Sequence, residues 1–331
     1  MTTPKANFLT ICLRGASQVF FMENALTGAL FFAAIAYASY ASGIWATTIG
    51  AAIGITVATG MAYLLNLDDE AAIEQGLYGF NGILVGAALP TFIAATPALW
   101  VYVVIGAAAS TVVTAAFSAT LTKGWGIPGS TGPFVLTGWL MVAGAYSFGG
   151  LDVTGDSPHL PVATAAHAAA MPPAMELLRI FFRNVGQVYL LGSWISGAII
   201  LLGIFIASVP AGIAAVAGSV IAMIVSIAMG ADPASVNAGL YGFSPVLTAL
   251  AVGVVFLRPS PRVALYAALA TIVTVFVQGA LDTIVAPIGV PSFTAPYVLV
   301  MYLFIAPKSL IAPHPHEPVA DHPVGGEPAA G

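Results

Sequence analysis

The chain has 331 residues, of which 59% are hydrophobic and 6% charged, and its mean hydropathy is +0.99. Soluble globular domains carry about 25% charged residues, so this composition excludes a soluble protein and indicates an integral membrane protein. The formal net charge of −5 does not form a patch, which argues against nucleic-acid binding. Cys12 is the only cysteine, and a single cysteine excludes an intrachain disulfide and a thiolate metal cluster.

Apolar runs of about 20 residues predict an all-α polytopic membrane protein. The run that follows Arg14 is too long for the apolar region of a signal peptide, so it is predicted to be the first span. No motif for a cofactor or an enzyme is recognised. The predicted spans, five in each half, are 19–41, 44–65, 80–96, 97–120, 133–150, 186–208, 210–230, 243–258, 263–281 and 295–312.

Four parts are predicted along the chain: a first repeat at 1–150, an extracytoplasmic linker at 151–182, a second repeat at 183–312 and a cytoplasmic tail at 313–331. The tail is rich in Gly, Pro and Ala and is expected to be disordered, because it cannot bury enough apolar surface to fold. Its three histidines, His314, His316 and His322, are expected to be solvated rather than bound to a metal.

A duplicated motif organises the sequence. Gly-Leu-Tyr-Gly-Phe occupies 76–80 and returns at 239–243, which is 163 positions later. Each copy has an Asp seven residues before it, a Leu four residues after its Phe, and a related Pro-containing segment further on, at 126–134 and 289–297. A pair of similar segments also precedes the motif, at Arg14 to Val19 and Arg183 to Val188. These segments are 169 positions apart rather than 163, so the first half carries six extra residues before the motif.

Five spans per repeat place the second repeat in the membrane in the opposite orientation, an inverted repeat of the kind that transporters use. With a cytoplasmic N-terminus, six of the eight Lys and Arg residues lie inside, and only Arg179 and Arg183 lie outside, in agreement with the positive-inside rule.

Each motif is predicted to end a re-entrant half-helix, at about 70–79 and 233–242. Asp69 and Asp232 are the expected N-caps, and about eight helical residues rise roughly 12 Å, less than half of the hydrocarbon core. The last carbonyl groups of each half-helix are expected to lack intrahelical partners, so they can accept hydrogen bonds from a solute rich in N–H donors.

Side chains provide the remaining candidates for the solute site. The hydroxyls of Thr131 and Thr294 could add hydrogen-bond partners. Apolar walls that suit a flat solute are expected from Phe80, Leu84, Phe243 and Leu247.

Together these paired motifs, with Gln18 and Gln187 ahead of the first span of each half, resemble the urea transporter family over about residues 14–310. The resemblance implies a homotrimer with one pore per subunit in the bacterial inner membrane. It also implies passive, channel-like permeation of urea, with short amides, ammonia or water as further solutes. By the same resemblance, Phe80, Leu84, Phe243 and Leu247 flank the slot, Thr131 and Thr294 lie at its central constriction, and Gln18, Phe21, Gln187 and Val188 line the two outer binding positions.

The two repeats also differ at positions near the predicted pore. Phe21 is paired with Leu190, Asn81 with Ser244, and Ser130 with Phe293. We therefore expect the two ends of the pore to bind solute unequally.

Other interpretations of the same residues remain open at this point. A single Gly-Leu-Tyr-Gly-Phe copy is typical of small-residue helix packing, and the glutamines and threonines also suit interhelical or intrahelical hydrogen bonds. An ion-coupled carrier for a small amide or amine would share the inverted repeats, and an intramembrane enzyme or a scaffold is a third possibility. Glu23 and Asp282 are interpreted as interfacial residues rather than proton relays.

Overall fold

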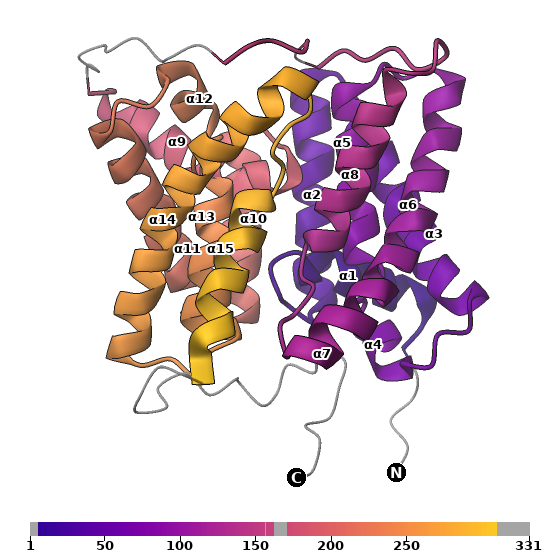
Figure 1. Ribbon diagram of the computed structural model, residues 1–331, viewed down its shortest axis with the longest axis horizontal. Helices are drawn as coiled ribbons and strands as arrows, with labels where there is room; N and C mark the ends of the chain where they lie inside the picture. The colour runs from indigo at the N-terminus through magenta and orange to yellow at the C-terminus, as the bar shows by residue number, and fades with distance from the viewer. Residues whose placement is uncertain (1–5, 156, 162–170, 310–331) are drawn as a thin grey trace. The chain divides into compact units, whose positions relative to one another are not determined.

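The computed structural model describes residues 6–155, 157–161 and 171–309, and these residues form helices joined by short connections. Within them the only extended pairing is an isolated bridge between Ile93 and Val153. The described chain divides into two compact units, one of residues 6–33 and 44–154 and the other of residues 34–43, 155, 157–161 and 171–309 (Figure 1). Each unit is described by itself below.

The first unit is built around α3, which packs against α5 and α6, while α5 also packs against α8. The last residues of α2, from residue 34, are grouped with the second unit. Its helices are α1 (Phe8–Gln18), α2 (Ala25–Ser42), α3 (Ala46–Leu64), α4 (Glu70–Glu74), α5 (Phe80–Phe92), α6 (Pro97–Phe117), the π-helix η1 (Ser118–Thr122), α7 (Lys123–Trp125) and α8 (Gly132–Ala145).

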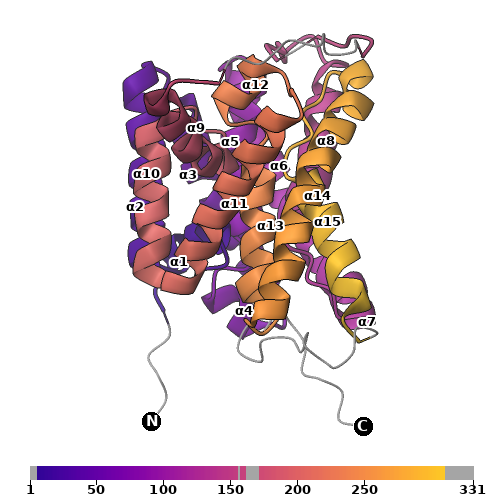
Figure 2. The same ribbon diagram turned by 90° about the vertical axis from the view of Figure 1, so that its left-hand side faces the viewer.

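The second unit has a corresponding core, in which α11, α13 and α14 contact one another and lie side by side in Figure 2. Its elements are α9 (Ala174–Gly186), the 3-10 helix η2 (Gln187–Tyr189), α10 (Trp194–Ala207), α11 (Val209–Ala228), α12 (Pro233–Ala238), α13 (Phe243–Leu250), the π-helix η3 (Ala251–Val255), α14 (Pro261–Val285), η4 (Ala286–Ile288), α15 (Ala295–Ile305) and η5 (Ala306–Ser309).

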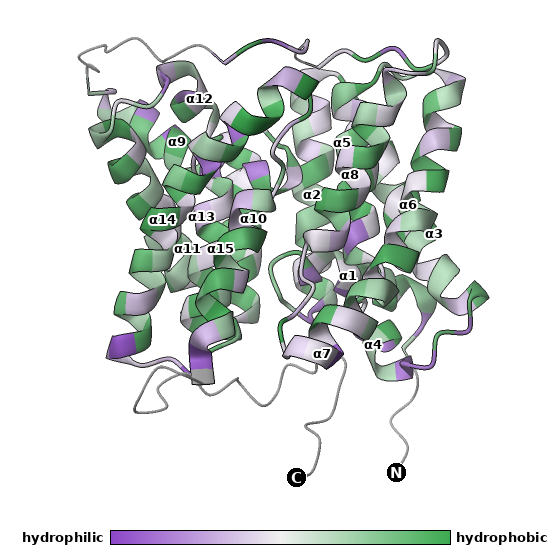
Figure 3. Cartoon of the chain, in the orientation of Figure 1, coloured by the Kyte–Doolittle hydropathy of each residue, from purple (hydrophilic) through white to green (hydrophobic). Residues whose placement is uncertain are grey.

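The helices have the length and composition of a polytopic membrane protein. Five stretches are long and apolar enough to cross a membrane, and α9 and α10 together form a sixth if they are one span with a bend of 75°. Hydrophilic residues lie mostly at helix ends and in connections (Figure 3). Each predicted span coincides with one of these stretches or with one of four shorter apolar helices, Phe80–Phe92, Gly132–Ala145, Phe243–Val255 and Ala295–Lys308.

The shorter helices differ from the predicted spans for a physical reason. At about 1.5 Å per residue, the 13 residues of α5 rise only about 20 Å, against roughly 30 Å of hydrocarbon. Such a helix is too short to cross the membrane alone. In the chain, α5 and α13 each follow a short helix, α4 (Glu70–Glu74) or α12 (Pro233–Ala238), and the joint crossing by each pair stays a prediction.

The internal repeat is visible in the backbone of the two units. The helices follow the same order, from α1 and α9 through α8 and α15. Four pairs of equivalent residues have matching positive φ angles: Phe21 and Leu190 (64° and 60°), Gly76 and Gly239 (80° and 82°), Gly126 and Gly289 (both 64°), and Ser130 and Phe293 (46° and 49°). The duplication therefore extends to backbone conformation, whereas the inverted orientation stays a prediction.

Length differences between the repeats have identifiable places. The six extra residues of the first repeat lie in α2, which has 18 residues against 14 in α10, and in the connection after it, 43–45 against the single Ser208. The offset then changes from 163 at the start of α5 to 164 at the start of α6, and returns to 163 at Gly126. The π-helices η3 and η1 lie in these two intervals, and a π turn accommodates one residue more than an α turn.

Two helices were not among the sequence predictions. α1 precedes the first predicted span, and α9 begins at Ala174 inside the predicted linker. Both are amphipathic helices that carry charged residues, so a search for wholly apolar runs passes over them. The predicted tail at 313–331, with His314, His316 and His322, lies outside the described residues.

Close contact between α3 and α5 depends on glycines four residues apart on both helices. A Cβ atom added to Gly54 would lie 2.1 Å from the carbonyl oxygen of Gly82, and one added to Gly50 would lie 2.1 Å from that of Gly86. Both atoms belong to backbone that cannot move aside. This contact holds α5, which begins at the motif, against the core of its unit.

We predict that Gly54→Ala lowers the yield of folded protein and its melting temperature, because the new methyl group forces the α3 and α5 backbones apart. Gly60→Ala is the matched control on the same helix, since a Cβ there has nothing within 4 Å. Thermal unfolding in detergent compares the two. Equal melting temperatures for both variants would contradict this account of the packing.

Candidate functional site

The two copies of the motif are each preceded by a short capped helix. Asp69 accepts a hydrogen bond from the N–H of Ala72 at 2.9 Å and Asp232 from that of Ser235 at 2.8 Å, so both predicted N-caps are present. Proline fits the first helical position because its missing N–H would be unpaired there in any case, and Pro233 occupies that position in α12.

The helical part of each segment is shorter than the sequence suggested. α4 has five residues and α12 has six. The turn that stops each helix is at the first glycine of the motif, since Gly76 and Gly239 have φ angles of 80° and 82°, where a residue with a side chain is strained. The second glycines, Gly79 and Gly242, instead begin the next helix as the N-caps of α5 and α13.

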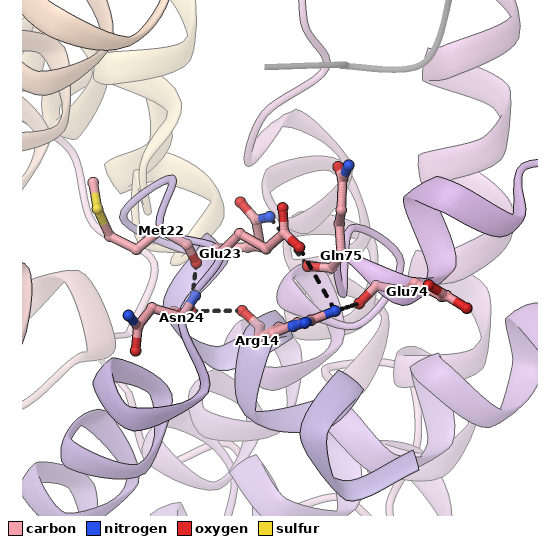
Figure 4. Close-up of polar contacts among 8 residues, drawn as sticks. Arg14, Met22, Glu23, Asn24, Glu74 and Gln75 are labelled. Carbon is pink, nitrogen blue, oxygen red and sulfur yellow. Dashed lines mark hydrogen bonds and ion pairs between the residues drawn. The ribbon is translucent and has the colours of Figure 1, made fainter. Parts of the chain in front are cut away.

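Two side chains of α1 bind the end of α4. Arg14 Nη1 donates to the carbonyl oxygen of Glu74 at 2.9 Å, and Gln18 Nε2 donates to that of Gln75 at 3.1 Å. Figure 4 shows Arg14 between Glu74 and Glu23, and its Nη1 is also 3.6 Å from Glu23 Oε1. A cation at a helix C-terminus is favourable because the unpaired carbonyls are the negative end of the helix dipole.

The second repeat has the same arrangement. Arg183 Nη1 donates to Asn237 O at 2.8 Å and Gln187 Nε2 donates to Ala238 O, also at 2.8 Å. The acidic partner differs, because Arg183 pairs with Glu176 on its own helix at 2.6 Å. The Arg and Gln contacts are therefore part of the duplicated design, whereas the acidic partners are not.

These contacts change which carbonyl groups can meet a solute. The last carbonyls of the half-helices were predicted to be available, but Arg14, Gln18 and their counterparts occupy them. The oxygens of Gly76 and Gly239, which come next, accept the N–H groups of Gly79 and Gly242 at 3.1 and 3.2 Å. No hydrogen bond within the described part of the chain uses the oxygens that follow, those of Leu77, Tyr78, Leu240 and Tyr241.

The predicted apolar walls occupy equivalent places in the two units. Phe80 and Phe243 are the first residues of α5 and α13 and are each 8% exposed, while Leu84 and Leu247 lie one turn later and are fully buried. Thr131 and Thr294 are the buried N-cap residues of α8 and α15, and neither side chain bonds to its own helix start.

Of the remaining predicted residues, Phe21 lies in the turn after α1, where its repeat partner is Leu190 after η2, and Val188 lies within η2. Phe21 and Leu190 take left-handed φ angles there, and their N–H groups donate to the carbonyls of Gln18 and Gln187 at 2.8 and 2.9 Å. Phe21 is partly exposed, whereas Val188 is only 1% exposed. Within each unit the structure thus brings the glutamine to the short helix before the motif and places the turn residue three positions after the glutamine.

Sequence reasoning missed the role of Arg14 and Arg183 at the half-helix ends. Their signal was available, because each arginine precedes its glutamine by four residues, and residues four apart share one face of a helix. Among the described residues, no group of three or more His, Cys, Asp or Glu side chains is placed to hold a metal ion.

Comparisons with known proteins agree on one family. The family model described as "Urea transporter" matches residues 9–309. "Urea transporter 1" of Capra hircus is 28% identical over 310 residues, and the match covers 90% of this chain and 76% of the relative. "Urea transporter 1" of Ovis aries and of Rattus norvegicus are each 27% identical, over 310 and 304 residues, with the same coverage.

We predict that Arg183→Met destabilises the second half-helix by about 1–3 kcal/mol, because the Asn237 carbonyl loses its charged donor. Arg179→Met is the matched control, since Arg179 also pairs with Glu176, at 3.3 Å, without a bond to the half-helix. An exposed pair of that kind contributes less than about 1 kcal/mol. Hydrogen exchange of residues 233–242 measures the effect, and faster exchange in both variants alike would contradict a specific role for Arg183.

Proposed function

Since the chain belongs to the urea transporter family, we propose that it conducts urea across a lipid bilayer by passive, channel-like permeation. The family is one of transporters, so the interpretation as an intramembrane enzyme is set aside. The relatives that match are named as urea transporters, which supports urea as the solute.

One observation carries the proposal: each repeat has backbone oxygens without a hydrogen-bond partner among the described residues, two and three positions before an aromatic residue. The carbonyls of Leu77 and Tyr78 precede Phe80, and those of Leu240 and Tyr241 precede Phe243, and no hydrogen bond among the described residues uses them. An amide-like solute buried without hydrogen bonds loses roughly 2–7 kcal/mol. Acceptors at these positions suit the N–H groups of urea, and the rings suit its flat faces.

Arginine and glutamine contacts give this proposal a structural basis. Broken backbone inside a membrane survives only where its polar groups are satisfied or line a cavity. Arg14, Gln18 and their counterparts satisfy the helix ends, so the acceptors left over lie two and three residues after Gln75 and Ala238, just before α5 and α13 begin.

The finer features of the proposal follow the family resemblance. We propose that the outer positions are lined by Gln18, Phe21, Gln187 and Val188, and that Thr131 and Thr294 add hydroxyls at the constriction. The repeats are proposed to be inverted, with both termini in the cytoplasm, in a homotrimer of the bacterial inner membrane. Short amides, ammonia or water are further candidate solutes.

We expect proteoliposomes that contain the purified protein to take up urea faster than empty liposomes, with or without an ion gradient. Selective pores hold their solute weakly at several sites, so the rate needs no coupling ion. Stopped-flow light scattering measures it. Absence of flux would reject urea conduction, and flux that requires the gradient would favour the ion-coupled carrier.

Replacement of Phe80 or Phe243 by Ala is expected to lower the ratio of urea to water permeability, because the slot widens where each ring is removed. Both permeabilities are measured in the same proteoliposomes and the values of empty liposomes are subtracted, so differences in protein amount cancel in the ratio. An unchanged ratio in both variants would place the solute path elsewhere.

A further inference from the structure

The segments that lead into α8 and α15 carry Thr131 and Thr294 and share a strained backbone. Ser130 and Phe293, one residue earlier, have φ angles of 46° and 49°, a region that residues with side chains seldom adopt. Such a conformation persists only when surrounding contacts hold it. The two repeats provide these contacts in different ways.

In the first repeat the contact comes from Asn81 on α5. The oxygen Oδ1 of this fully buried amide accepts the N–H of Phe134 at 3.1 Å, and its Nδ2 donates to Thr114 Oγ1 on α6 at 3.1 Å and to Ser130 O at 3.4 Å. The N–H groups of a first helical turn need acceptors from outside the helix. Asn81 supplies one such acceptor to α8, and its side chain therefore bonds to the backbone both before and after Thr131.

In the second repeat the residue at the place of Asn81 is Ser244, and its buried hydroxyl has no hydrogen-bond partner among the described residues. The amide comes instead from Gln278 on α14. Its Nε2 donates to Ser292 Oγ at 2.8 Å and to the two carboxylate oxygens of Asp282 at 3.0 and 3.1 Å. Gln278 is 1% exposed and Ser292 4%, and Ser292 lies two residues before Thr294.

The amide and the hydroxyl have exchanged places between two helices that pack together. Counted from Pro97 and Pro261, the first residues of α6 and α14, Gln278 is the counterpart of Thr114. The first repeat therefore has an amide on α5 that faces a hydroxyl on α6. The second has a hydroxyl on α13 and the amide on α14, and these two helices pack together as α5 and α6 do.

We propose that Asn81 with Thr114, and Gln278 with Asp282 and Ser292, are positioning residues that hold Thr131 and Thr294 in the geometry that sets solute selectivity. The link to selectivity rests on the proposed urea pore. The amide in each repeat acts through the threonine segment and does not itself touch the solute. One segment is held by a neutral pair of side chains and the other by an amide bound to a carboxylate.

The test begins with Asn81→Ser, which places in the first repeat the residue that the second repeat has. We expect it to lower the permeability ratio of urea to N-methylurea about three- to tenfold, the effect of one net hydrogen bond. The double variant Asn81→Ser with Thr114→Gln returns an amide from the facing helix, and its ratio is expected to recover. A merely structural role would change the amount of folded protein and leave the ratio as it is.

Ser110→Ala on α6 is the matched control, because this buried hydroxyl donates only to Ala107 of its own helix, at 2.7 Å. Hydrogen exchange of residues 126–135 is measured in every variant and is expected to speed up in Asn81→Ser alone. If Asn81→Ser does not fold, Thr114→Val replaces it, since it removes the hydroxyl that accepts from Asn81 and keeps the shape of the side chain.

The proposal is overturned if Asn81→Ser matches Ser110→Ala in both the permeability ratio and the exchange of 126–135, or if the double variant fails to recover. If the unaltered protein carries no urea, the proposed function fails. The exchange of residues 126–135 then still decides whether Asn81 holds the segment.

Discussion

The constraint on which the rest of the structure depends is the cost of ending a helix without partners for its last carbonyl groups. The cost is largest in hydrocarbon, which offers no water to satisfy such groups. In each repeat an arginine and a glutamine from a preceding amphipathic helix bind two of these groups, Glu74 and Gln75 in the first and Asn237 and Ala238 in the second. The left-handed turn at Gly76 or Gly239 stops each short helix, the arginine and glutamine satisfy its end, and the unpaired oxygens follow between that turn and Phe80 or Phe243. Helices α1 and α9 thus belong to the site as much as the motif does.

The duplication provides this arrangement twice, but it has not kept the two copies chemically equal. Arg14 pairs with Glu23 in the turn after α1, whereas Arg183 pairs with Glu176 in the first turn of α9. Asn81 and Gln278 lie on opposite members of equivalent helix pairs. Backbone conformation has been retained more strictly than side-chain chemistry, as the matching φ angles at Phe21 and Leu190, a large aromatic and an aliphatic residue, indicate. The two repeats therefore share backbone geometry at these turns and differ in the side chains around them.

Much of the fold follows from the sequence because its strongest signals are local. Ten apolar stretches, the Asp69 and Asp232 caps and the duplicated motif need only hydropathy, capping chemistry and repetition to be recognised. The sequence prediction was wrong where a contact joins distant segments. It left the half-helix carbonyls free because the four-residue spacing of Arg14 and Gln18 shows only that they share a helix face, and does not show that this face reaches carbonyls some 60 positions later. It extended the half-helices to the second glycine because the position that requires a positive φ angle is decided by the turn, and both glycines fit the pattern. A comparison of the two halves at one fixed offset pairs Asn81 with Ser244, so it could not show that the second repeat has its amide, Gln278, on the other helix.

The two π-helices have a consequence for how this protein can be cut and rejoined. One extra residue in a continuous α-helix turns everything after it by about 100°, which would carry a buried side chain round to the lipid. Here η3 accommodates the extra residue of the second repeat and η1 that of the first. The two repeats are therefore out of register by one residue between these π-helices and in register again after them. Chimaeras that exchange the whole segment from the motif to Gly126 for the segment from the motif to Gly289 keep the buried face of each helix turned toward its neighbours. Junctions placed inside that interval shift one helix against its neighbours, however similar the exchanged sequences are.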